Sequence, residues 1–272
     1  MFIFLVLLFF IGINVALAFL IPLPPIWFCL WVPVAIVSGF LATVVVILCG
    51  LLIGAKTKPT GKFKRFVLRS GLKLFCLVYG TKLVVHNKEN LPKKNGYTIY
   101  GNHKSNMDVI YAYLCANGPT TALGKKSLFG PWIMKKIANC YRALPIDREN
   151  DREAAKSIIT AIKLVKEGMN MIIFPEGGVK SRETEEMVAL RAGAYKVAVK
   201  AKAPVVPIAI IGSSKLQKKK LFKRVKIDLF ILKPLYYEDY VKLTETEAGL
   251  TTALGLKVEE MINECIKENE GN

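Results

Sequence analysis

The first 55 residues lack any charged side chain, and the first charge in the chain is Lys56. An uncharged segment of this length belongs in lipid. It divides at "IPLPPIW" into two apolar runs, and about 20 apolar residues suffice to span a hydrocarbon core. Residues 1–55 are therefore predicted to form a membrane anchor of two transmembrane helices joined by a tight proline turn.

A charged region before the first apolar run is also missing, which argues against a cleaved signal peptide because such peptides carry one. A shallow hairpin in place of two full spans stays open. Trp27 and Trp31 lie beside the turn, where interfacial aromatic rings are favoured. A basic stretch follows the second run: Lys56, Lys58, Lys62, Lys64 and Arg65. By the positive-inside rule, we expect an integral membrane protein whose residues 56–272 are cytoplasmic.

Metal-ligand spacing is absent as well. The six cysteines are scattered and form no CxxC or Cys/His pattern, and the chain has only two histidines. Reduced cysteines in a cytosolic compartment are the simplest interpretation. We therefore expect no metal site.

Acidic residues are scarce relative to basic ones, since 39 Lys and Arg stand against 21 Asp and Glu and give a net charge of +18. This excess favours an anionic partner, either nucleic acid or an anionic membrane surface. The chain lacks an evident nucleic-acid-binding motif, and its apolar start favours lipid, so we expect no nucleic-acid partner. One basic cluster is predicted to attract anionic phospholipids by about 1 kcal/mol per residue near the surface, with a solvated loop as the alternative. The cluster comprises Lys215, Lys218, Lys219, Lys220, Lys223, Arg224 and Lys226.

Short β-branched runs alternate with amphipathic stretches in residues 56–272. Strands are predicted at 82–86, 97–101, 170–174, 204–211 and 225–232, and helices at 106–116, 151–168, 190–202 and 244–270. Such alternation predicts an α/β fold, a layered domain with a central, largely parallel β-sheet flanked by helices. One cytosolic domain, residues 56–272, would then follow the membrane anchor, residues 1–55.

His103 occurs in "GNHKSNMDV", residues 101–109, five positions before Asp108. The stretch before it is strand-like and the stretch after it is helix-like, which predicts a turn at the carboxyl end of a strand, where ligands bind in open α/β sheets. Residues five apart on a continuous helix are rotated by about 140°, so His103 must lie just before the helix and Asp108 in its first turns if the side chains are to meet. Such a pair abstracts a proton, because the carboxylate orients the imidazole and stabilises the imidazolium that forms. A plain turn, with Asp108 favouring the helix N-terminus, is the alternative.

A second polar stretch is "NMIIFPEGGVKSRE", residues 170–183. An apolar strand runs into Pro175, then a carboxylate, two glycines that let backbone approach a ligand, and two cations, Lys180 and Arg182. This order predicts a cradle for an anionic, hydroxyl-bearing head group, with Glu176 accepting from a hydroxyl and the cations holding phosphate. A simple turn with solvated charges is the alternative.

Together, "NHKSNMD" and "FPEGG", about 70 residues apart, resemble the 1-acylglycerol-3-phosphate acyltransferase family, the HxxxxD-type glycerolipid acyltransferases. The resemblance covers roughly residues 75–235. Arg148 in "LPIDRE" aligns with the family's basic residue for the glycerol phosphate, and Pro207 in "APVVPIAI" aligns with its fourth block. "GKKSLFGPW" is similar to the family's Lys-containing segment and places Lys125 at its basic position.

One departure concerns the phosphate. Many members follow FPEG with Thr-Arg-Ser, whereas Gly178 and Val179 occupy the first two of those positions here. The guanidinium expected there is missing, so either Lys180 or Arg182 replaces it, or Arg148 holds the phosphate alone. A lysine does not reproduce the bidentate fork of an arginine.

The resemblance implies transfer of a fatty acyl group from an acyl thioester to the sn-2 hydroxyl of lysophosphatidic acid, giving phosphatidic acid in phospholipid biosynthesis. Acyl-CoA or acyl carrier protein would be the co-substrate, with no cofactor bound. His103 would be the general base and Asp108 its orienter. The expected substrate-binding residues are Asn102, Lys125, Arg148, Phe174, Pro175, Glu176, Gly177, Gly178 and Lys180. The alternatives are acylation of another acceptor, such as glycerol 3-phosphate or another lysophospholipid, and a catalytically silent lipid-binding scaffold.

Overall fold

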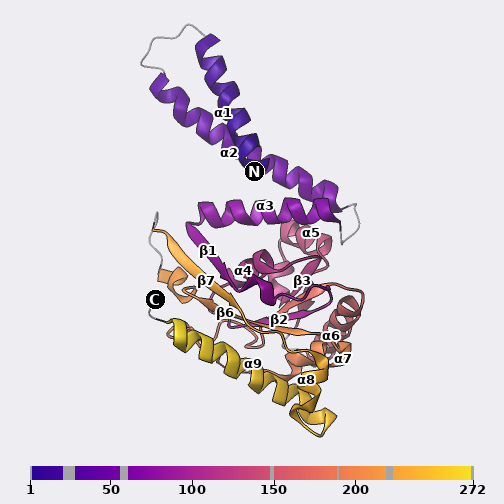
Figure 1. Cartoon of the computed structure of the whole chain (residues 1–272). Coiled ribbons are helices and arrows are strands. Elements are labelled where there is room, and N and C mark those ends of the chain that lie inside the picture. Colours follow the sequence, from indigo (N-terminus) through magenta and orange to yellow (C-terminus); the bar gives the residue numbers. More distant parts are fainter. Residues whose placement is uncertain are drawn as a thin grey trace. The chain divides into compact units, whose positions relative to one another are not determined.

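The computed structural model describes residues 2–20, 28–55, 61–147, 150–188, 190–218 and 223–270. The chain divides into two compact units, Met1–Leu74 and Phe75–Asn272. The division falls inside a helix, later in the chain than the predicted boundary after residue 55. Figure 1 labels most of the helices and strands of both units.

The first unit is helical and comprises α1 (Phe2–Leu20), α2 (Phe28–Ala55) and most of α3 (Lys62–Val78). Glycines of α2 lie where the helices approach closely. A Cβ on Gly39 would lie 3.5 Å from side-chain atoms of Leu7 and Ile11 in α1, and one on Gly50 would lie 3.0 Å from Val67 in α3. The missing side chains let these apolar helices pack.

The predicted pair of helices in residues 1–55 is present as α1 and α2. Within the described ranges, however, no helix combines the length and apolar character that count as a membrane span. The prediction of two transmembrane helices is therefore not supported by the structure. Trp27, Lys56 and Lys58, which served as flanking signals, lie outside the described residues.

The second unit contains a sheet of seven strands in the described part of the chain, in the order β1-β7-β6-β2-β5-β3-β4. The strands are β1 (Thr81–His86), β2 (Thr98–Gly101), β3 (Thr120–Lys125), β4 (Leu144–Ile146), β5 (Asn170–Ile173), β6 (Val205–Ile211) and β7 (Val225–Ile231). All neighbours are parallel except β6 and β7. The predicted α/β fold with a largely parallel sheet is confirmed.

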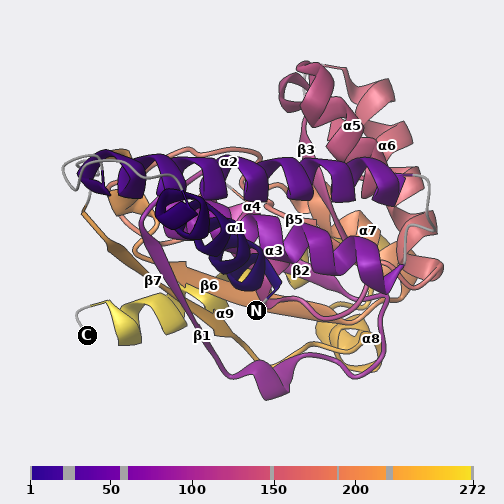
Figure 2. The same ribbon diagram turned by 90° about the horizontal axis from the view of Figure 1, so that it is seen from above.

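Helices cover both faces of this sheet (Figure 1 and Figure 2). They are α4 (Asp108–Cys115), α5 (Trp132–Cys140), α6 (Asp151–Lys166), α7 (Lys196–Ala201), α8 (Tyr237–Tyr240) and α9 (Glu247–Asn269), with the 3₁₀ turn η4 (Ala192–Tyr195) before α7. The main hydrophobic core joins α6, α7 and α9 to one face of β2, β5 and β6. Apolar residues at helical spacing on α6 and α9 form the helix side of this core.

Both motif-bearing turns begin at the carboxyl ends of adjacent central strands. β2 pairs in parallel with β5 and β6, so Asn102 and His103, which follow β2, emerge beside Phe174 and Pro175, which follow β5. Strand order thus brings together two stretches that are far apart in sequence.

Candidate active site

His103 and Asp108 meet as their spacing requires. β2 ends at Gly101 and α4 begins at Asp108, so His103 precedes the helix and the carboxylate occupies its first turn. The imidazole Nδ1 lies 3.1 Å from Oδ2 of Asp108. With Nδ1 turned toward the carboxylate, Nε2 is the nitrogen that is left to face a substrate.

Asp108 is fully buried, and three donors converge on its Oδ2. Besides the imidazole, the backbone N–H groups of Lys104 and Ser105 donate to this oxygen, each at 2.7 Å. The turn after His103 is therefore closed around the carboxylate, which fixes both the backbone and the ring. Such a fixed carboxylate selects one imidazole tautomer and stabilises an imidazolium.

The FPEGG turn contacts the imidazole directly. The ring of Phe174 stacks on the ring of His103 with 4.5 Å between centroids. In addition, Oε1 of Glu176 accepts a hydrogen bond from the backbone N–H of His103 at 2.7 Å. The two motifs are thus joined by one aromatic contact and one charge-assisted hydrogen bond.

Glu176 is fully buried, which differs from its predicted place at a substrate hydroxyl. Its Oε2 lies 3.7 Å from Nζ of Lys104, whose side chain is fully buried as well. Burial raises the pKa of the Glu176 carboxyl, while the N–H groups of His103 and Val188 and the Lys104 ammonium oppose that rise. The geometry assigns Glu176 to holding the His103 turn, and contact with substrate stays a prediction.

Asn102 is also buried, and its amide is taken by the protein backbone. Nδ2 donates to the carbonyl groups of Glu185 and Ile210, at 2.7 and 2.8 Å, and Oδ1 accepts from the N–H of Ile210 at 2.8 Å. This amide fastens the His103 turn to β6. The predicted substrate contact of Asn102 is therefore disfavoured by its geometry.

The two glycines after Glu176 both have positive φ, 72° at Gly177 and 143° at Gly178, conformations that side-chain-bearing residues rarely adopt. Lys180 follows with an exposed side chain. Arg182, farther along, donates from Nε to the carbonyl oxygen of Lys104 at 3.1 Å. The turn is therefore shaped by glycine and held to the His103 motif from two sides.

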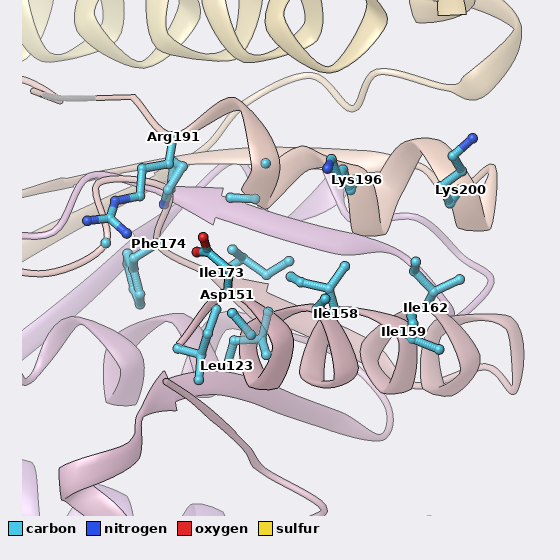
Figure 3. Close-up of a pocket in the computed structure, with 17 residues that line it drawn as sticks. Leu123, Asp151, Ile158, Ile159, Ile162, Ile173, Phe174, Arg191, Lys196 and Lys200 are labelled. Atoms are coloured by element: carbon cyan, nitrogen blue, oxygen red, sulfur yellow. The ribbon is translucent and has the colours of Figure 1, made fainter. Parts of the chain in front are cut away.

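A cavity of about 530 Å³ opens beside this turn. Its floor is the end of β5 with Phe174, Pro175 and Gly177, and its walls are α6 on one side and η4 with α7 on the other. Figure 3 shows Arg191 and Phe174 near one end, with Lys196 and Lys200 toward the other. Apolar side chains of α6 line the space between: Ala154, Ala155, Ile158, Ile159 and Ile162.

Two further residues belong to the predicted site, Lys125 and Arg148. Lys125 is the exposed last residue of β3, at the same carboxyl edge of the sheet. Arg148 lies outside the described residues. Among the residues that the structure describes, no group of three or more His, Cys, Asp or Glu side chains is arranged to hold a metal ion.

Sequence reasoning missed Lys104, Glu185 and Arg191. Lys104 was passed over because a lysine beside a polar motif is usually solvated. Glu185 accepts from the N–H of Gly212 and from the hydroxyl of Ser214, at 2.9 and 2.6 Å. Arg191 looked like an ordinary helix residue, and only its return to the FPEGG turn distinguishes it.

The arrangement is suited to proton abstraction from an alcohol. A buried carboxylate orients an imidazole at a strand's carboxyl end, and an apolar cavity begins at the aromatic ring that stacks on that imidazole. No protein nucleophile is required if the attacking hydroxyl belongs to the substrate.

Comparison with known proteins places these features in a wider group. A profile of the family described as "Acyltransferase" matches residues 82–211. The 1-acyl-sn-glycerol-3-phosphate acyltransferase of Bacillus subtilis is 40% identical over 186 residues, which cover 66% of this chain and 87% of that protein. The enzyme of the same description from Borreliella burgdorferi is 29% identical over 192 residues, covering 69% and 74%.

A solved structure shows the same fold. The crystal structure of the 1-acyl-sn-glycerophosphate (LPA) acyltransferase from Thermotoga maritima matches with a TM-score of 0.64, covering 86% of this chain and 93% of that chain. The sequence identity is 21%, so the likeness concerns the fold.

Proposed function

The chain belongs to the 1-acyl-sn-glycerol-3-phosphate acyltransferase family, and from this premise we propose that it acylates the sn-2 hydroxyl of 1-acyl-glycerol 3-phosphate. The product is phosphatidic acid. The observation that carries the chemical part is the 3.1 Å contact between His103 Nδ1 and Asp108 Oδ2 at the turn after β2. That contact supplies an oriented base at the edge of the sheet where ligands bind.

His103 acts as the general base. Its Nε2 takes the proton of the sn-2 hydroxyl while the hydroxyl oxygen forms a bond to the thioester carbonyl carbon. Collapse of the tetrahedral intermediate breaks the carbon–sulfur bond, and the imidazolium returns its proton to the departing thiolate. Asp108 stays ionised and holds the ring throughout. The donor is an acyl thioester of coenzyme A or of acyl carrier protein.

The apolar cavity beside Phe174 receives an acyl chain. Its isoleucine wall on α6 provides the apolar surface that a hydrocarbon chain prefers, and its catalytic end lies against the Phe174 ring, which touches the base. The hydrocarbon part of the acyl chain is therefore buried, while the ester or thioester at its end stays near His103.

The protein works at a membrane, with its second unit on the cytoplasmic side. Both the acceptor and the product are amphiphiles, and α1 and α2 expose large apolar side chains, among them Phe4, Phe9, Phe19 and Leu20. The cations of α3, which come after these helices, favour the cytoplasmic leaflet with its anionic lipids.

A thiol-release assay on purified full-length protein tests the reaction. Acyl-CoA and acyl carrier protein donors are crossed with lysophosphatidic acid, glycerol 3-phosphate and other lysophospholipids. We expect turnover with lysophosphatidic acid, and its loss in His103→Ala protein that keeps the wild-type melting temperature. Binding of lipid without thiol release would indicate a catalytically silent lipid-binding scaffold. A preference for another acceptor would show that lysophosphatidic acid is not the substrate. Substantial turnover by folded His103→Ala protein would remove the base assignment.

A further inference from the structure

The phosphate of the acceptor needs a cation, and the FPEGG turn lacks the one that the family motif leads us to expect. Val179 occupies the position of the family's arginine, and its aliphatic side chain offers phosphate neither charge nor a hydrogen bond. A different residue must therefore meet this charge if the chain performs the proposed reaction.

Arg191 reaches the turn from a distant part of the chain. A Cβ placed on Gly177 would lie 2.7 Å from Nε, 3.0 Å from Cδ and 3.1 Å from Cζ of Arg191. The guanidinium group therefore lies directly over Gly177, two positions before Val179. A side chain at residue 177 would occupy this space, so the glycine is required for the contact as well as for its φ of 72°.

The backbone holds Arg191 in this place. Its N–H donates to the carbonyl oxygen of Pro175 at 3.1 Å, and η4 begins at the next residue. The arginine is thus fixed to the FPEGG turn at its main chain, while η4 and α7 carry the chain away along the cavity. This fixed main chain keeps the guanidinium within reach of the turn.

The position is close to the base. Arg191 and Phe174 line the same end of the cavity (Figure 3), and Gly177 lies against Arg191. The Phe174 ring in turn stacks on the ring of His103. In lysophosphatidic acid, only two carbon atoms and one ester oxygen separate the reacting hydroxyl oxygen from phosphorus. When the hydroxyl lies at His103, the phosphate must therefore lie close by. Arg191 is separated from His103 by the Phe174 side chain, so its guanidinium is placed to meet this phosphate.

Several other described cations are engaged by carboxylates or lie toward the other end of the cavity, as Lys196 and Lys200 do (Figure 3). Lys104 is buried against Glu176, and Lys126 is paired with Asp147 at 2.9 Å. Arg191 is exposed, and within the described residues no carboxylate forms an ion pair with it. Asp151 lines the same cavity on the α6 side, but it lies beyond ion-pair distance of Arg191.

We propose that Arg191 binds the phosphate of the lysophospholipid acceptor, in place of the arginine that Val179 has replaced. This assignment rests on the proposed function. Its planar fork donates two parallel hydrogen bonds to phosphate oxygens, which fixes the glycerol backbone as well as the charge. Arg191 thereby acts as a specificity determinant that favours phosphate-bearing acceptors.

The test uses full-length Arg191→Ala, Arg191→Lys and the double variant Arg191→Ala with Val179→Arg. We expect Arg191→Ala to raise the KM for lysophosphatidic acid roughly 10- to 100-fold, which is the loss of affinity expected when hydrogen bonds to a charged group are removed. The KM for the acyl donor stays unchanged, and Arg191→Lys recovers part of the loss. Val179→Arg, which returns a guanidinium to the motif position, restores at least a tenth of wild-type kcat/KM in the Arg191→Ala background. Lys242→Ala, an exposed cation of the same unit outside the cavity, is the matched control.

Three outcomes would overturn the proposal: a KM within twofold of wild type in Arg191→Ala, a raised donor KM instead, or the acceptor effect appearing in Lys180→Ala and not in Arg191→Ala. Calorimetric binding of glycerol 3-phosphate to wild type and Arg191→Ala separates this inference from the reaction itself. If wild type turns over no lysophosphatidic acid, the proposed function fails. Equal binding of glycerol 3-phosphate by both proteins then rejects Arg191 as the phosphate residue, whereas selective loss in the variant keeps it.

Discussion

At the scale of single residues, the buried pair of Lys104 and Glu176 holds the turn that carries the base, because Glu176 accepts a hydrogen bond from the His103 N–H. Both side chains are fully buried, and Nζ and Oε2, 3.7 Å apart, have no hydrogen-bond partner among the described residues. The Lys104 ammonium therefore faces the Glu176 carboxylate, which is stabilised first by the His103 N–H and then by this ammonium. Removing one partner of such a pair leaves an uncompensated buried charge, which is more harmful than removing both.

We expect Lys104→Met to destabilise the protein by about 3–5 kcal/mol at pH 8. Glu176 already has a raised pKa in the folded state because of burial, and loss of the ammonium raises that pKa further. A carboxyl with a raised folded-state pKa stabilises the fold below its unfolded-state pKa, and this stabilisation is lost as pH rises through the folded-state pKa. The damage should therefore shrink between pH 8 and pH 5.

Thermal unfolding in detergent at both pH values measures this effect. Lys104→Met combined with Glu176→Gln is the control, because the glutamine oxygen still accepts from the His103 N–H while neither residue of the pair carries a charge. The double variant should be more stable than Lys104→Met at pH 8. A pH-independent loss in Lys104→Met would show that packing, and not charge, is what the lysine contributes.

Asp108→Asn tests the orientation of the imidazole. An asparagine can present its NH₂ group to Nδ1, which favours the wrong tautomer, so we expect kcat to fall on the order of 10³- to 10⁴-fold. The KM for lysophosphatidic acid should change little, since Asp108 is buried beneath the ring. Steady-state kinetics of the purified variant measure this effect, and circular dichroism verifies its folding. A kcat within tenfold of wild type would contradict the role of Asp108 in orienting the imidazole.

At the scale of elements, most of the strands and helices were predicted from their patterns, but several elements were missed, among them the 17-residue helix α3. Helices α6 and α9 and strands β5, β6 and β7 coincide closely with the predicted ranges. The two helices have apolar residues at helical spacing, and the strands are short β-branched runs bounded by Gly, Pro or Asn. Helix α5 and strands β3 and β4 were missed. β3 (Thr120–Lys125) contains a glycine and ends at a lysine, and β4 spans only Leu144–Ile146, so neither gives a clear strand pattern.

Helix α6 forms one wall of the cavity, so we expect its side chains to limit the length of the acyl chain that the protein accepts. Ile158 lies nearer the catalytic end than Ile162 (Figure 3), so a bulky residue at each position should block the cavity at a different depth. We expect Ile162→Trp to reduce turnover of the longest acyl chains at least tenfold and to spare shorter ones. Ile158→Trp should also exclude chains of intermediate length.

Competition assays with mixed chain lengths measure this selectivity. Leu256→Trp, on an exposed position of α9 away from the cavity, is the control for a surface tryptophan. Uniform loss at all chain lengths in both α6 variants would indicate a folding defect, and unchanged preference would place the acyl chain elsewhere.

At the scale of the whole molecule, charge and apolar surface are segregated along the chain. The helices α1 and α2 contain no charged residue, whereas the net charge of +18 is carried by residues later in the chain. Apolar contact with lipid is insensitive to salt, but attraction between a basic surface and anionic lipids is screened within about 10 Å at 0.1 M salt. The two forces are therefore separable by experiment.

We expect full-length protein in membrane fractions to remain bound after washing with 1 M salt, because apolar burial dominates its attachment. Sedimentation followed by immunoblotting measures the bound fraction. A peripheral protein of the same cells, released by the wash, is the control. Release of most of the chain by salt would show that its basic residues, and not α1 and α2, hold it to the membrane.

The sequence by itself determined the α/β character, the apolar start of the chain, and the meeting of His103 with Asp108. These features depend on local periodicity and short spacing, which act within one element or one turn. Their physical basis is that side-chain direction repeats every two residues in a strand and every 3.6 in a helix.

Only the tertiary structure decided which distant residues share the site. The order β6-β2-β5 sets Asn102 against β6 and Glu176 beneath His103, and the chain's return after the FPEGG turn carries Arg191 back over Gly177. Buried polar groups take whatever partners the packed strands bring near, because an unpaired one is costly. Asn102 and Glu176 are buried with partners from the protein, a placement that the motif pattern alone did not indicate.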